Sequence, residues 1–268
     1  MPNFQPDSSV VAEVVASPNH NERRDEANPN MIVLHYTGMP DSKAALQLLC
    51  TPTSEVSSHY FVFEDGRIVQ CVPEARRAWH AGVSSWAGEN DVNSRSIGIE
   101  IANPGHDYGY PEFPLRQVAA VIALCRGIFA RRYIRPDRLL AHSDVAPTRK
   151  KDPGERFPWR LLHESGVGHW VDPEPITPAA DDPLKLGDSS DAVKELQSAL
   201  AEYGYEITAN GGYDNQTQDV VTAFQRHFRP AQVDGIADAS TRKTLRKLID
   251  ARKTLVSPIE ATLQGGSR

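Results

Sequence analysis

Two histidines and one aspartate occupy positions where metal ligands are commonly found. His35 ends the apolar run 31–35, His142 ends the run 139–142, and Asp152 follows in a loop rich in Pro and Gly. Both runs are typical of strands buried on both faces, and functional groups gather where such strands end. Two neutral imidazoles and one carboxylate could hold zinc and leave a fourth position for water. Spacing alone leaves the alternative that these are ordinary core or surface residues.

A second carboxylate and an ammonium group could join this set. The isoleucines of residues 96–101 alternate with Glu100, so a strand would place Glu100 on the opposite face. Lys150 stands shortly before Asp152, and on an extended loop residues two apart point the same way. The alternatives are a glutamate that faces solvent and a solvated basic loop that includes Arg149.

The elements around these residues alternate between strands and helices. Residues 59–63 and 67–72 flank Glu-Asp-Gly, a tight-turn signal that predicts an antiparallel hairpin. Apolar residues recur at the helical period from Pro114 to Arg132, which predicts a long helix. Residues 1–30 contain several prolines among polar residues and are expected to form an irregular arm.

Composition excludes several classes of protein. The chain has 268 residues, a net charge of −6 and 40% hydrophobic residues, so we expect no nucleic-acid partner and no integral membrane association. Its 3 cysteines show no CxxC pairing, and no basic n-region or apolar h-region of a signal peptide is read at the N-terminus. These features favour the cytoplasm; a periplasmic location, reached by a signal not visible in the sequence, is the alternative.

Five ordered motifs give the chain a family resemblance. The motifs are Leu-His-Tyr-Thr at 34–37, Val-Ser-Ser-His-Tyr at 56–60, Ala-Trp-His-Ala-Gly at 78–82, the strand 96–103, and 141–154. By these motifs the chain resembles the type-2 N-acetylmuramoyl-L-alanine amidases, which share the peptidoglycan-recognition-protein fold, and looks most similar to their AmpD/AmiD branch. The resemblance implies an α/β fold with a mixed central β-sheet flanked by helices.

The resemblance also implies roles for the residues above. His35, His142 and Asp152 would bind Zn2+, Glu100 would transfer protons, and Lys150 would stabilise the oxyanion. The reaction would cut the amide between the lactyl group of N-acetylmuramic acid and L-alanine, in peptidoglycan or in muropeptides that include 1,6-anhydro forms. Cell-wall recycling or turnover is the implied process, and a non-catalytic peptidoglycan sensor is the alternative.

Further residues are candidates for contact with substrate. Trp79 and His80 offer an aromatic face and a polar tip in one loop, which suits a sugar ring and the lactyl-peptide junction. Asn103 could orient the substrate amide. The other candidates are Tyr36, His59 and Arg149. For the aromatic and histidine residues, packing in the core is the alternative.

The C-terminal part carries a second resemblance. Three segments with helical periodicity follow polar clusters, which predicts a small three-helix domain. Its motifs resemble the peptidoglycan-binding type-1 module, with an atypical stretch at 226–230. Dimerisation or docking is the alternative role. If the module binds peptidoglycan, it would work as a tether whose reach is set by a proline-rich linker.

These observations predict a division of the chain. An N-terminal arm (1–30) precedes a zinc amidase domain (31–172), and a linker (173–183) leads to the helical domain (184–250). A flexible tail (251–268) follows. Peptidoglycan fragments or the sacculus are the expected partners.

Overall fold

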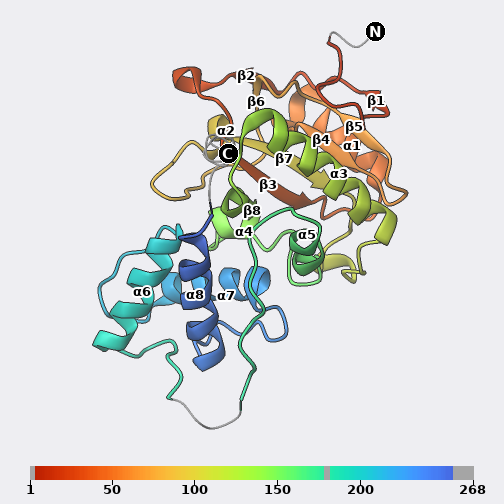
Figure 1. The fold of residues 1–268 in the computed structure, drawn as a ribbon. Coiled ribbons are helices and arrows are strands. Elements are labelled where there is room, and N and C mark those ends of the chain that lie inside the picture. The colour runs from red at the N-terminus through yellow and green to blue at the C-terminus, as the bar shows by residue number, and fades with distance from the viewer. Residues whose placement is uncertain (1–3, 178–181, 256–268) are drawn as a thin grey trace, which may run out of the picture.

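A mixed six-stranded sheet forms the centre of the amidase-like region (Figure 1). The computed structural model describes residues 4–177 and 182–255. The sheet order is β1-β5-β4-β7-β3-β8, and a separate two-stranded sheet pairs β2 with β6. Within the large sheet β4 and β5 are antiparallel, whereas the other neighbours are parallel. The strands are β1 (Glu13–Val14), β2 (His20–Glu22), β3 (Met31–Tyr36), β4 (Tyr60–Val62), β5 (Ile68–Gln70), β6 (Arg76–Ala78), β7 (Ser96–Ile101) and β8 (Leu139–Ala141).

Helices cover both faces of this sheet (Figure 1). The long helix α3 packs with the isoleucines of β7 in one core, and α1 packs with Phe61 of β4 in a second core on the opposite face. The helices are α1 (Ser42–Leu49), α2 (Val92–Arg95), α3 (Leu115–Arg132), α4 (His142–Val145), α5 (Trp159–Glu164), α6 (Asp191–Tyr203), α7 (Asn215–Phe228) and α8 (Ala239–Arg252). The expected α/β class and the long helix are therefore confirmed.

The strand order brings the polar strand ends together. β3 lies between β7 and β8 in parallel, and the register pairs His35 with Glu100. Because neighbours in register point to the same face, both side chains lie on the face that α1 covers. β8 ends at Ala141, so His142 is the first residue of α4 rather than the last residue of a strand.

The N-terminal segment is more ordered than expected. β1 extends the large sheet beside β5, and β2 pairs with β6. Arg23 is buried and donates hydrogen bonds to the carbonyls of Glu74 and Ser94. The irregular arm predicted over residues 1–30 therefore contains, among its described residues, two short strands that pair with distant ones, and such pairing is not visible in local composition.

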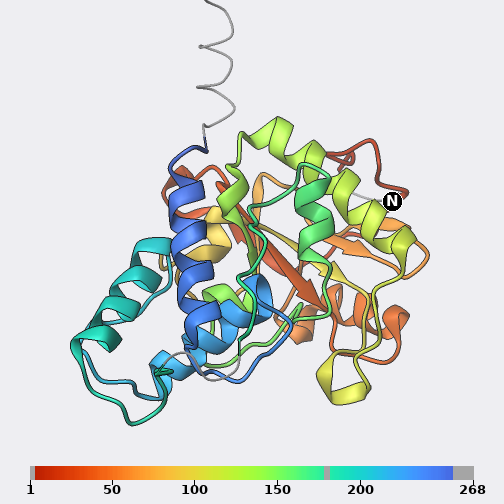
Figure 2. The ribbon, with the colours of Figure 1, turned by 60° about the horizontal axis from the view of Figure 1, so that its bottom comes forward.

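Three helices form the C-terminal domain, as expected. Ser190, Asp214 and Asp238 cap α6, α7 and α8 by accepting from backbone amides of the first turn. Figure 2 shows these helices lying against the amidase-like region beside α4, with α7 packed on α4.

The connection between the two regions is only partly an extended spacer. Residues 173–177 form no helix or strand, yet Glu174 accepts a hydrogen bond from Lys247 of α8 at 2.9 Å. Residues 178–181 of the expected linker and 256–268 of the expected tail lie outside the described residues. None of the helices in the described ranges has the length and hydropathy needed to cross a bilayer.

Candidate metal centre and active site

Three donor atoms from separate elements meet at the end of the central strands. His35 comes from β3, His142 from α4, and Asp152 from the loop that follows α4. The two Nδ1 atoms lie 2.9 Å apart, and Asp152 Oδ2 lies 3.1 Å from that of His35 and 2.9 Å from that of His142. Ligands bound at about 2.0–2.1 Å in a tetrahedral zinc site lie about 3.3 Å from one another. The cluster is therefore compact enough for three atoms to hold one ion.

The charge state of the cluster suits a metal cation. Burial, together with the neighbouring His142, lowers the pKa of His35 to about 4, so its imidazole is neutral at pH 7. Burial alone would raise the pKa of Asp152, but the facing imidazoles of His142 and His35 hold it far below its usual range. Neutral nitrogen and anionic oxygen are the donor forms that zinc binds. These residues therefore fit a zinc ion.

Outer hydrogen bonds orient both imidazoles. His142 Nε2 donates to the carbonyl oxygen of Ala81 at 3.1 Å, so its Nδ1 presents a lone pair to the cluster. His35 Nε2 lies 3.0 Å from His80 Nδ1, and His80 Nε2 lies 3.1 Å from the hydroxyl of Ser96. Partners of this kind fix the ring orientation of metal-binding histidines. The loop at 80–81 therefore supports both candidate ligands.

A cleft of about 470 Å³ opens beside the three donors. Glu100 and Lys150 both line it. Burial, reinforced by the negative charge of Asp152, raises the pKa of Glu100 well above its usual range, while Lys150 opposes this shift. Within the described part of the chain, Oε2 of Glu100 is buried and has no hydrogen-bond partner. A carboxylate that holds a proton so readily is suited to general acid–base chemistry.

Four of the candidate substrate contacts also line the cleft: Tyr36, Trp79, His80 and Arg149. The indole Nε1 of Trp79 donates to Asn21 Oδ1 at 2.9 Å. Burial raises the pKa of Tyr36 to about 12, and its hydroxyl lies 2.9 Å from His106 Nδ1. The guanidinium of Arg149 donates to the carbonyl of Val83, which ties the loop after α4 to the rim of the cleft.

Comparison with known proteins identifies the family. A model of N-acetylmuramoyl-L-alanine amidases matches residues 25–155. The amidase AmiD of Escherichia coli (strain K12) is 37% identical over 234 residues, which cover 82% of each chain. The chain belongs to the N-acetylmuramoyl-L-alanine amidase family.

Solved structures and a second family model agree with this assignment. The complex of Escherichia coli AmiD with anhydro-N-acetylmuramic acid-L-Ala-D-gamma-Glu-L-Lys aligns with a TM-score of 0.71 at 34% identity and covers 93% of each chain. AmpDh3 of Pseudomonas aeruginosa in complex with anhydromuramic pentapeptide aligns with a TM-score of 0.69 at 29% identity, covering 94% of this amidase and 99% of that chain. A model of peptidoglycan binding domains matches residues 189–245 of this amidase. Both resemblances read from the sequence are confirmed.

Two residues expected at the substrate lie elsewhere in the amidase. His59 is fully buried; its Nδ1 accepts from the amide of Gly98, and its Nε2 donates to the carbonyl of Arg76. Asn103 holds its own loop by accepting from the amide of Gly105 and donating to the carbonyl of Pro111. Neither lines the cleft. Backbone partners use the polar groups of both residues, so their role as substrate contacts stays a prediction that the lining of the cleft does not support.

His80 has a different place from the one expected. It touches the cleft, but its ring nitrogens face His35 and Ser96 rather than an incoming substrate. Its contacts therefore support His35, one of the three candidate metal ligands.

The structure also adds residues that sequence reasoning missed. Ser96 supports His80, while His106 links Tyr36 to Glu155 at 3.2 Å. No spacing signal marks any of these residues, since their partners are distant in the chain.

Proposed function

We propose that this amidase hydrolyses the amide between the lactyl group of N-acetylmuramic acid and L-alanine in muropeptides, including those with 1,6-anhydro sugars. The observation that carries the proposal is the convergence of His35, His142 and Asp152 beside a cleft lined by Glu100 and Lys150. The anhydromuramyl peptides in the AmiD and AmpDh3 complexes support the anhydro form of the substrate.

Zinc is the proposed cofactor, and His35, His142 and Asp152 are its proposed ligands. When bound, zinc supplies a Lewis acid that makes water nucleophilic near neutral pH. The two imidazoles are held for this task by Ala81 and His80.

Glu100 and Lys150 are the proposed catalytic residues. Glu100 accepts the proton of the attacking water and passes it to the nitrogen of the leaving L-alanine. Its raised pKa suits both steps, since the group can hold the proton between them. Lys150 lines the cleft beside it, where its ammonium group can stabilise the negative oxygen that forms on the scissile carbonyl.

The residues that line the cleft are proposed to hold the substrate. Trp79 offers an aromatic face to the sugar, and Tyr36 offers a hydroxyl that His106 already orients. Arg149 supplies positive charge at the rim, which suits the carboxylates of the stem peptide. Soluble fragments and the sacculus are the proposed partners, and the cytoplasmic location stays a prediction.

Incubation of the purified amidase with a 1,6-anhydro-muramyl tripeptide tests the proposal. Mass spectrometry should detect free tripeptide with zinc present and none after treatment with a chelator. Asp152→Ala should abolish both cleavage and zinc binding. Absence of cleavage by the zinc-loaded wild type would refute the substrate, and cleavage that survives both the chelator and Asp152→Ala would refute the metal site.

A further inference from the structure

The C-terminal domain packs closely on the amidase region. The backbone amide of Ala87 donates to the carbonyl of Gly204 at 2.8 Å, and the indole of Trp86 meets the ring of Tyr205 edge-on at 4.9 Å. A Cβ atom on Gly204 would lie only 2.6 Å from the Trp86 ring. The two regions therefore meet at a fitted, buried surface rather than through a linker alone.

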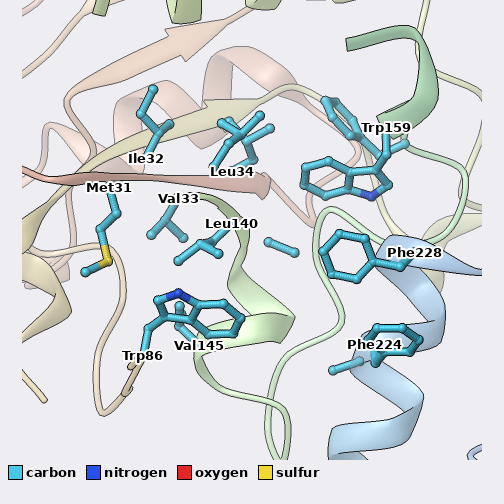
Figure 3. Close-up of a cluster of buried hydrophobic side chains, with 14 of the residues drawn as sticks. Met31, Ile32, Val33, Leu34, Trp86, Leu140, Val145, Trp159, Phe224 and Phe228 are labelled. Atoms are coloured by element: carbon cyan, nitrogen blue, oxygen red, sulfur yellow. The ribbon is translucent and has the colours of Figure 1, made fainter. Parts of the chain in front are cut away.

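The core itself continues across this boundary. Figure 3 shows Trp159 beside Phe228 of α7, in the same cluster as Leu34 and Leu140 of the central sheet. His227 stacks on Trp159, with ring centroids 3.7 Å apart. These contacts belong to the atypical stretch 226–230, whose departure from the peptidoglycan-binding pattern is explained by docking.

A buried carboxylate lies at the centre of this surface. Asp144 is 1% exposed and belongs to α4. It accepts hydrogen bonds from the hydroxyl of Tyr205 at 2.7 Å, from Nδ1 of His227 at 2.6 Å and from the amide of Ala141 at 2.8 Å. Among the described residues, two of these three donors come from the C-terminal domain. An unpaired buried carboxylate is costly, so these donors fix the position of Asp144.

Asp144 is connected to His142 and Asp152 through the backbone of α4. It follows His142 by two residues in the one-turn helix α4, and its bond to Ala141 caps the start of that helix. The amide of Ser143 donates to the carbonyl of Asp152 at 3.0 Å. The loop that carries Asp152 is therefore bound to the same helical turn. A single helical turn is not stable by itself. Whatever holds Asp144 therefore holds both His142 and Asp152.

A second path leads from α7 to the cleft. Arg226 lies 3.7 Å from Glu155, which contacts His106, and His106 in turn contacts the hydroxyl of Tyr36. Adjacent residues of α7 thus reach a metal-ligand turn and a residue that lines the cleft.

We propose that the C-terminal domain is a structural part of the amidase site, in which Tyr205 and His227 position the α4 turn that carries His142. These two are positioning residues, because neither lines the cleft. The inference rests on the proposed function, and it extends the role of the domain beyond binding of peptidoglycan. A domain that served only as a tether would affect the hydrolysis of sacculi and leave the hydrolysis of soluble fragments unchanged.

Two buried tyrosines of the C-terminal domain give a matched test in the full chain. Tyr205→Phe removes a donor to Asp144, whereas Tyr213→Phe removes a hydroxyl that donates to Gly235 within the domain, at 2.8 Å. Zinc affinity is measured without substrate by competition with a chromophoric chelator. We expect Tyr205→Phe to weaken zinc binding about 10-fold or more and Tyr213→Phe to leave it unchanged. On a soluble anhydro-muropeptide, kcat should fall for Tyr205→Phe while KM changes little.

His227→Phe is the second variant, since it keeps a ring beside Trp159 but loses the donor. It should weaken zinc binding in the same direction, and it serves as the test if Tyr205→Phe does not fold. Equal zinc affinity in Tyr205→Phe and wild type, equal losses in Tyr205→Phe and Tyr213→Phe, or a loss confined to sacculi would each overturn the inference. Wild-type protein that neither binds zinc nor cleaves would instead refute the proposed function.

Discussion

Glu100 shows how the surroundings of one residue can give it a reactive state. The β3–β7 register sets it beside His35, and burial with Asp152 nearby disfavours its charged form. An ordinary exposed glutamate would be ionised at pH 7 and would hold a proton poorly. The strand pattern predicts that Glu100 lies on the face opposite the isoleucines, but its raised pKa follows from burial.

Replacement of this carboxyl should separate catalysis from metal binding. We expect Glu100→Gln to lower kcat about 10²–10⁴-fold while zinc affinity stays near that of the wild type, because the amide keeps the shape but cannot transfer the proton. Steady-state hydrolysis of a soluble muropeptide and chelator competition measure the two quantities. A kcat within a few-fold of the wild type would assign proton transfer to another group.

Gly98 tests the support behind His35. A Cβ atom there would lie 2.4 Å from the ring of His80, so Gly98→Ala must displace that ring. We expect zinc affinity to fall about 10–100-fold, as for loss of other outer partners of metal ligands. Gly212→Ala is the control, since its Cβ would meet Asn210 at an ordinary 3.6 Å. Unchanged zinc affinity in Gly98→Ala would show that His80 does not orient the ligand.

At the scale of elements, a buried ion-pair network connects helix α3 to the loop between β5 and β6. Glu74 is fully buried and accepts from Arg131 and Arg132 of α3 at 2.7 Å each, and from the hydroxyl of Tyr60. Burial alone would raise the pKa of Glu74, but these hydrogen bonds bring it below the ordinary value. The network therefore depends on the ionised carboxylate.

This network should give the protein a pH-dependent stability. Because the folded pKa of Glu74 is lowered, its contribution is present above the unfolded pKa of about 4.3 and is lost as pH falls through the folded value. We expect Glu74→Gln to lower the free energy of unfolding by about 2–3 kcal/mol at pH 7 and by less at pH 3. Urea unfolding at both pH values measures the difference. The exposed Glu64→Gln is the control, and an equal loss at pH 7 and pH 3 would contradict the prediction.

At the scale of the whole molecule, docking should make the two regions unfold together. One cluster of buried residues contains both Leu34 and Phe228 and crosses the boundary, so we expect a single calorimetric transition for the wild type. Gly204→Ala should separate this into two transitions, because its Cβ would collide with Trp86 at 2.6 Å.

A second glycine controls for backbone strain in this experiment. Gly187 also has a positive φ, of 97°, but a Cβ atom there meets nothing within 4 Å. Gly187→Ala should therefore lower stability without separating the transitions. Two transitions in the wild type would show that the regions are thermodynamically independent.

Local sequence patterns predicted several of the residues that line the cleft beside the candidate metal site. Three kinds of local feature pointed to these residues. They are the apolar runs that end in His35 and His142, the alternation around Glu100, and the proline-rich loop that contains Asp152. They are readable because strand and helix periodicity depend on neighbours along the chain. Ordered motifs then supplied the family, which the comparisons confirm.

Tertiary structure decided which polar groups remain free to act. His59 and Asn103 were expected at the substrate, but backbone groups brought in by the fold use their hydrogen-bonding atoms. No function was predicted for Asp144 from the sequence. Tyr205 and His227, which lie 61 and 83 positions away in the chain, both donate hydrogen bonds to it. Contacts over such distances depend on strand order and domain docking, which leave no periodic signal in the chain. The sequence by itself thus determined the chemistry available, and only the folded structure decided how the α4 turn that carries His142 is held.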